Sequence, residues 1–243
     1  MKLAVLKRLQ AVRDAGQAVG ILTDLDSHDQ SLVDDQGAVL EGVHPPKEIE
    51  TQFAQISRES IATDVNKLYV LEGRRIFVRV FGPPYVLIVI GAVHISQYLL
   101  PMAQMAGFEV HLVEPRSAFA SPERFPNVTI NTNWPDRAIE EIGLTARTAM
   151  VTLSHDPKID EPALTAALRA GVLYVGALGS RKTHAKRLGR LGELGMTESE
   201  LEKIHSPVGL PLGGRSPAEI AVAILAQIIS HRYAAASRTT SLG

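Results

Sequence analysis

The sequence predicts an α/β protein in which a Rossmann-like domain with a parallel sheet follows a smaller α+β domain. A continuous apolar run at residues 85–90, rich in valine and isoleucine, is typical of a parallel strand that is buried on both faces. Beyond it, similar runs alternate with segments of helical periodicity, which indicates right-handed βαβ crossovers. A Gly-Pro-Pro sequence at residues 82–84 interrupts the chain just before this alternation begins. We therefore expect an N-terminal domain at residues 1–82 and a Rossmann-like domain at residues 85–243.

The N-terminal domain is expected to contain both helices and strands. Leu3, Leu6 and Leu9 recur at helical spacing within residues 2–15, which predicts one amphipathic helix. The other elements expected are a strand at 19–25, a short strand and turn at 31–37, a helix opened by the prolines at 45–46, and a hairpin at 68–81.

From residue 85 onward the expected strands and helices alternate. Ile95, Leu99 and Met102 carry the helical pattern that follows the first strand. Residues 216–219 (Ser-Pro-Ala-Glu) form a capping box, which predicts the start of the last helix. The other elements expected are strands at 108–113, 149–153 and 173–177, a helix at 160–170, and a short helix after a second capping box at 197–200.

Composition excludes several classes of protein. The 25 lysine and arginine residues nearly balance the 26 acidic residues, so no general attraction to nucleic acid is expected. The absence of cysteine excludes disulfides, thiolate metal sites and a persulfide on this chain. Lys7 and Arg8 interrupt the apolar start, and the longest apolar run is about half of the ~20 residues that span a bilayer. We expect a cytoplasmic protein without a membrane span.

The first candidate site is the turn after the first buried strand, where Gly91 and Ala92 precede a helix beginning near His94. In a dinucleotide-binding fold this turn presents backbone N–H groups and a helix N-terminus to a pyrophosphate. The usual pattern is G-x-G-x-x-G, and Val93 and Ser96 replace its second and third glycines. The turn either binds phosphate or belongs to a fold that no longer binds dinucleotides tightly.

Glu114 ends the second buried strand of this domain. A carboxylate about 20 residues after the glycine-rich turn binds the ribose of NAD in dinucleotide folds. Arg116 could instead meet the 2′-phosphate of NADP, and the remaining alternative is an exposed acid at a strand end. NAD(P) therefore stays open as a cofactor.

Ser154, His155 and Asp156 follow the strand at 149–153, on the edge where open α/β sheets bind ligands. His155 could hydrogen-bond a phosphate or a pterin, or relay a proton. The alternative is that Asp156 caps the next helix while His155 is solvated beside it. The G-x-S-x-G pattern of a hydrolase nucleophile is absent.

Gly179, Ser180, Arg181 and Lys182 follow the strand at 173–177 on the same edge. A glycine allows close approach, and the three polar residues supply phosphate donors at a helix start. Further basic residues follow at Lys186, Arg187 and Arg190, which we expect on the solvated face of that helix if the segment binds no anion.

A loop rich in glycine and proline at residues 204–215 contains His205. Rigid loops of this kind often line binding sites, and the alternative is a turn selected for its geometry alone.

Taken in order, six segments between residues 85 and 232 resemble the XdhC/CoxI family of maturation factors for molybdenum hydroxylases. They are Gly91-Ala92-x-His94-Ile95, Phe119-x-x-Pro122-Glu123-Arg124-Phe125-Pro126, Thr152-x-Ser154-His155-Asp156, Tyr174-Val175-Gly176-x-x-Gly179-Ser180-Arg181-Lys182, Ile204-His205-Ser206-Pro207-x-Gly209-Leu210, and Ser216-Pro217-Ala218-Glu219-Ile220-Ala221.

The resemblance implies a protein that binds molybdenum cofactor as cargo, assists its sulfuration and delivers it to a xanthine- or CO-dehydrogenase-type apoenzyme. It implies a maturation factor without turnover of its own, so no catalytic residue and no resident metal are assigned. A cysteine desulfurase and a second copy of the chain stay open as further partners. The residues that the resemblance and the motifs assign to cofactor binding are Gly91, Ala92, His94, Glu114, His155, Gly179, Ser180, Arg181, Lys182 and His205.

Two departures from the family pattern keep other classes open. The family's turn reads G-A-G-H-V-G, from which Val93 and Ser96 depart, and its N-terminal glycine-rich stretch with a cysteine has no counterpart in residues 1–82. The alternatives are an NAD(P)-dependent oxidoreductase and a scaffold with a degenerate nucleotide fold.

Overall fold

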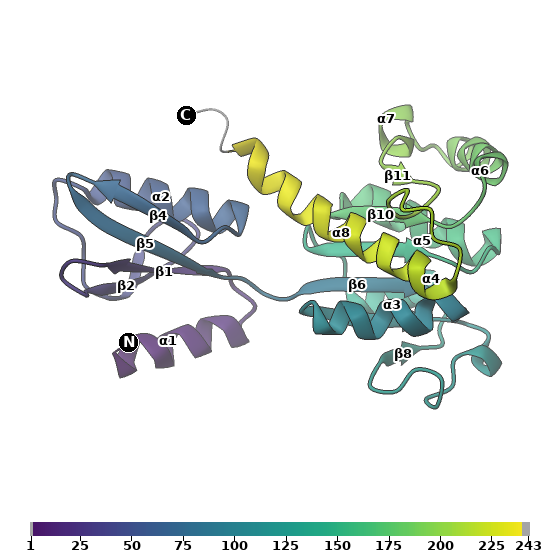
Figure 1. Cartoon of the computed structure of the whole chain (residues 1–243), viewed down its shortest axis with the longest axis horizontal. Coiled ribbons are helices and arrows are strands. Elements are labelled where there is room, and N and C mark those ends of the chain that lie inside the picture. Colours follow the sequence, from purple (N-terminus) through teal and green to yellow (C-terminus); the bar gives the residue numbers. More distant parts are fainter. Residues whose placement is uncertain (1, 240–243) are drawn as a thin grey trace. The chain divides into compact units, whose positions relative to one another are not determined.

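The computed structural model describes residues 2–239, which divide into two compact units between Pro83 and Pro84 (Figure 1). The second unit runs from Pro84 to Tyr233, and the described residues from Ala234 onward cluster with the first unit.

The first unit is built on an antiparallel sheet of five strands in the order β3-β2-β1-β5-β4. Its elements are α1 (Leu3–Asp14), β1 (Val19–Asp24), β2 (Gln30–Val33), β3 (Val39–Gly42), α2 (Glu50–Thr63), β4 (Lys67–Leu71) and β5 (Arg74–Phe81). The hairpin between β4 and β5 turns at Glu72 and Gly73, which both have positive φ, as a tight two-residue turn requires.

The two helices of this unit cover opposite faces of the sheet. Phe53 and Ile56 of α2 pack in one apolar cluster with Ile76 of β5, and Val5 and Leu9 of α1 pack in the other with strand residues. Alternating strand residues supply the two clusters, because successive side chains point to opposite faces. The helix expected from residues 45–46 begins only at Glu50.

The second unit contains a parallel sheet of six strands in the order β11-β10-β9-β6-β7-β8. Its elements are β6 (Tyr85–Ile90), α3 (His94–Met105), β7 (Phe108–Val113), the 3-10 helix η1 (Ser117–Phe119), β8 (Thr129–Asn131), α4 (Pro135–Ile142), β9 (Thr148–Thr152), α5 (Pro157–Ala170), β10 (Tyr174–Ala177), α6 (Arg181–Glu193), α7 (Glu198–Leu201), β11 (Ile204–His205) and α8 (Pro217–Thr239). Read from β8, the strands follow the order third, second, first, fourth, fifth, sixth, which is the Rossmann order. The predicted fold class is confirmed.

Helices cover both faces of this sheet (Figure 1). Leu99 of α3 and Ile224 of α8 pack with Leu87 on one face, while Ile139 of α4 and Leu164 of α5 pack with Ile88 on the other. Burial of β6 on both faces explains its unbroken apolar sequence.

Both predicted capping boxes form. Thr197 and Glu200 exchange hydrogen bonds at the start of α7, and Ser216 and Glu219 do so before α8. The sequence patterns did not predict β8 or α4, and α5 begins three residues before the expected start at residue 160. No helix within residues 2–239 is long and apolar enough to cross a membrane.

Candidate functional site at the carboxyl edge of the parallel sheet

The sheet of the second unit reverses its strand order at β6. The chain passes from β6 to β7 on one side, and β9 pairs with β6 on the other. Loops that leave the carboxyl ends of β6 and β9 therefore run to opposite faces, which is where open α/β sheets form a ligand crevice. The segments beginning at Gly91 and Leu153 flank this point.

The turn at Gly91 is held against the loop that follows β9. Gly91 has φ of 112°, and a Cβ atom on it would lie 2.8 Å from the backbone nitrogen of Ser154. Only glycine fits this approach, since the neighbouring atom is backbone. The buried Ser96 hydroxyl donates to the Gly91 carbonyl at 2.6 Å, so serine takes the place of the small packing residue expected there.

Glu114 is fully buried beneath this turn, so it is not the exposed strand-end acid considered as an alternative. One carboxylate oxygen accepts the Ala92 amide at 3.0 Å, and both oxygens accept guanidinium N–H groups of Arg116 at 2.7 and 2.9 Å. Burial alone would raise the pKa of Glu114, but the bonds from Arg116 and Ala92 bring it below its usual value. Glu114 and Arg116 are thus engaged with each other, and Glu114 also holds the Ala92 amide, while the Arg116 side chain stays 41% exposed.

The loop after β9 combines a capping residue with an exposed histidine. Asp156 accepts the Lys158 amide at 3.0 Å and caps α5. This is the alternative in which Asp156 has a structural role. His155 is exposed and has φ of 63°, in the left-handed region that histidine enters more readily than most residues. Ser154 donates through its hydroxyl to Asp160 at 2.7 Å.

A buried ion pair lies below the loops that follow β9 and β10. Asp160 and Arg187 are 1% and 3% exposed, and their nearest charged atoms are 4.0 Å apart. Asp160 holds Ser154, while Nη2 of Arg187 donates to the Leu178 carbonyl at 2.9 Å. Burial raises the pKa of Asp160 and lowers that of Arg187.

The alternative in which Arg187 lies on a solvated helix face is wrong for this residue. Arg187 stands four residues before Leu191, a fully buried residue of the same helix, and so shares its inward face. The four-residue spacing between Arg187 and Leu191 is the sequence feature that could have predicted the burial of Arg187. A charged residue on an apolar stripe is informative because charges are rarely buried without a partner.

The turn at Gly179 presents its charges to solvent. Ser180 caps α6 by accepting the Thr183 amide at 3.2 Å, and Arg181 and Lys182 are the exposed first two residues of the helix. Gly179 has φ of 149°, which its lack of a Cβ permits. The structure therefore brings all four predicted residues to one helix N-terminus, where backbone N–H groups and cations favour an anion.

His205 lies in β11 and is engaged inside the unit. Its ring stacks on Tyr174, with centroids 5.0 Å apart, and its Nε2 atom is 3.0 Å from Nε2 of His231. Burial, and then the neighbouring His231, lowers the pKa of His205. Among the described residues, His205 is linked to Tyr174 and α8 and makes no hydrogen bond or ring contact with the turns at Gly91 and Gly179.

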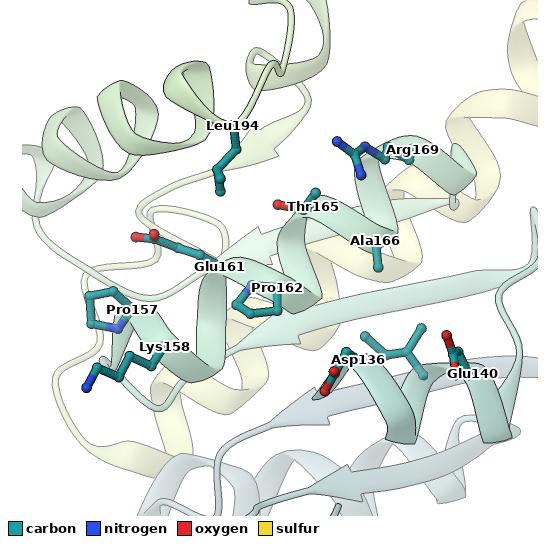
Figure 2. A pocket seen from close by; sticks show the side chains of 11 residues that line it. Asp136, Glu140, Pro157, Lys158, Glu161, Pro162, Thr165, Ala166, Arg169 and Leu194 are labelled. Carbon is teal, nitrogen blue, oxygen red and sulfur yellow. The ribbon is translucent and has the colours of Figure 1, made fainter. Parts of the chain in front are cut away.

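A separate groove of about 470 Å³ lies beside α4 and α5 (Figure 2). Side chains of both helices line it, including Asp136, Glu140 and Lys158, and Leu194 after α6 borders it. None of the ten predicted site residues lines this groove.

Residues 87–228 match the family described as the XdhC Rossmann domain. The chain belongs to the XdhC family. The match spans the carboxyl-edge loops of β6, β7, β9 and β10, so the family's Rossmann domain includes both glycine turns described above. The predicted family is confirmed.

Three curated relatives show what this XdhC-family chain is similar to. It is 41% identical over 85 residues to the molybdenum cofactor insertion chaperone PaoD of Escherichia coli K12, which is 35% of this chain and 27% of that protein. It is 30% identical over 157 residues to a probable xanthine dehydrogenase subunit of Bacillus subtilis 168, covering 64% of this chain and 46% of that protein. The uncharacterized protein YqeB of Escherichia coli K12 is 27% identical over 156 residues, covering 63% of this chain and 28% of that protein.

The fold also has a solved counterpart. A crystal structure titled as a xanthine dehydrogenase from Bacillus halodurans superposes with a TM-score of 0.71 at 22% identity, covering 95% of this chain and 65% of that one. The likeness supports the fold of the XdhC-family chain. The chain spans less than half of each of the three curated relatives.

Proposed function

We propose that this XdhC-family protein binds molybdenum cofactor as cargo, assists its sulfuration and delivers it to the apoenzyme of a molybdenum hydroxylase. The observation that carries the proposal is the similarity to a molybdenum cofactor insertion chaperone.

The turn at Gly179 is the part of the edge best suited to the anionic group of the cargo. Molybdopterin carries a phosphate, and a helix N-terminus with two adjacent cations provides both amide donors and charge. Arg181 and Lys182 would contact that phosphate, while Ser180 holds the first turn of α6 in place. The exposed His155 would border the pterin from the neighbouring loop.

Sulfuration requires a sulfur donor from outside this chain. A transferable persulfide is carried on a cysteine thiolate, and the sequence contains no cysteine. A cysteine desulfurase is therefore the partner that would supply the sulfur, with this chain holding the cofactor while the transfer occurs.

The direct test is to identify small molecules that co-purify with the chain from cells that make molybdenum cofactor. We expect molybdopterin, free or as its nucleotide, to be released on denaturation and detected by mass spectrometry. We also expect the loaded protein to activate a molybdenum hydroxylase apoenzyme. A chain that carries no pterin from such cells and does not activate the apoenzyme would favour the scaffold alternative.

An NAD(P)-dependent oxidoreductase is the second candidate, because the sheet has the Rossmann strand order. The carboxylate expected to hold the ribose, Glu114, is instead occupied by Ala92 and Arg116. Nicotinamide oxidation or reduction by the purified chain with any substrate would favour this candidate.

A further inference from the structure

The first unit contains a cavity of about 260 Å³ that lies outside the matched Rossmann domain. Its floor is apolar and its rim is polar. The floor is formed by Leu22, Ile49, Phe53 and Ile76, which are all at most 5% exposed. The rim includes Asp24, Ser27, Asp29, His44 and Arg74.

The size of the cavity limits its occupant. Pockets for drug-sized ligands start at about 300 Å³, slightly above this volume. One small ring system fits the cavity, whereas a whole dinucleotide exceeds it.

Two carboxylates on the rim differ in how far the chain satisfies them. Asp24 accepts the amides of Asp26 and Ser27 through one oxygen and the guanidinium of Arg74 through the other. Asp29 accepts only the Ser27 hydroxyl, at 3.1 Å on Oδ2. Within residues 2–239, Oδ1 of Asp29 accepts no hydrogen bond, and no cation pairs with this carboxylate.

The carboxylate of Asp29, which no cation of the described residues neutralises, determines which ligand chemistry the cavity would recognise. An ionised carboxylate is an acceptor only, and its two oxygens can take two parallel N–H bonds from one planar group. The apolar floor, which includes the Phe53 ring, suits a flat ring above it. Together these features favour a heterocycle that offers adjacent N–H groups along one edge.

We propose that the cavity of the first unit binds a planar heterocycle with an amidine-like N–H edge, which pairs with Asp29 while the ring packs on the apolar floor. The aminopyrimidine rings of a pterin and of guanine both have this edge. The proposal concerns a second site and stands independently of the anion site at the turn of Gly179.

The test is calorimetric titration of the full chain with two probes, neopterin and guanosine. We expect at least one probe to bind the wild type, and Asp29→Asn to weaken that binding about tenfold or more by removing the charge and one acceptor. Asp35→Asn is the matched control, since it removes the same charge from an exposed turn outside the cavity. It should leave the affinity unchanged.

The two probes also identify the source of the ring. Binding of neopterin alone would assign the site to a pterin, binding of guanosine alone would assign it to guanine, and equal binding would assign it to the shared edge. Asparagine keeps an oxygen for Ser27, so thermal melting should show Asp29→Asn folded like the wild type. Failure of both probes to bind, or equal weakening by Asp29→Asn and Asp35→Asn, would overturn the proposal.

Discussion

The two glycine turns at the carboxyl edge both join a buried strand to a helix, yet their polar groups are used differently. At Gly91 both backbone groups of Ala92 are engaged within the chain: Glu114 accepts the Ala92 amide, and Arg124 donates to the Ala92 carbonyl at 3.2 Å. At Gly179 the flanking cations Arg181 and Lys182 are exposed. The first turn has thus lost the Ala92 amide as a donor, whereas two exposed cations stand beside the second turn, so the second turn is the better anion site.

The buried pair of Asp160 and Arg187 is what holds the second turn against the rest of the edge. Replacing Arg187 with Met should leave Asp160 buried without its counter-charge and free the Leu178 carbonyl. Breaking a buried pair in this way costs about 3–5 kcal/mol, the largest effect we expect on the edge. Chemical denaturation of the variant measures the loss.

A matched control lies on α4. Arg137 pairs with Glu141 at the surface, where their side chains are 73% and 44% exposed, so Arg137→Met should cost no more than about 1 kcal/mol. Similar losses for the two variants would show that burial of the Arg187 pair does not matter to stability.

A substitution in the turn at Gly91 should have a smaller effect than the loss of the buried ion pair. Val93 stands where the dinucleotide pattern has its second glycine, and Val93→Gly would clear the backbone approach. Because the Ala92 amide and Glu114 are already engaged with each other, we expect the variant to gain no measurable affinity for NAD or NADP. Calorimetry checks this, and a tenfold gain would mean that the turn is a dinucleotide site blocked by one side chain.

The contrast between the turns also shows which features the sequence could predict. Local rules predicted the unbroken strand at residues 85–90, the capping boxes at Thr197 and Ser216, and a helix start at residues 180–182. Each depends on neighbours within a few residues. The three-residue strand β8 is too short to carry a periodic pattern of its own.

The features that the sequence could not predict depend on contacts between residues that are far apart in the sequence. Glu114 ends its strand where a ribose ligand belongs, but only the folded chain reveals that Ala92, 22 residues earlier, takes up its oxygen. Arg187 is close in sequence to exposed basic residues, and its partner Asp160 comes from another helix. The sequence suggests that His205 is a ligand-binding residue of a loop, whereas in the structure its ring packs against Tyr174 and His231.

The most direct test of the central claim is cofactor retention by the double variant Arg181→Ala, Lys182→Ala. Charge-assisted hydrogen bonds contribute about 1.5–3 kcal/mol each, so losing one engaged contact should weaken molybdopterin binding about tenfold or more. Stability should stay within about 0.5 kcal/mol, because both side chains are exposed.

The matched control is Lys186→Ala with Lys203→Ala, which removes two exposed cations outside this helix start. Pterin retention on gel filtration, followed by thermal melting, compares both variants with the wild type. We expect loss of pterin only in the variant at Arg181 and Lys182, with unchanged melting. Equal retention in all three proteins would contradict the assignment of the anion site to the turn at Gly179.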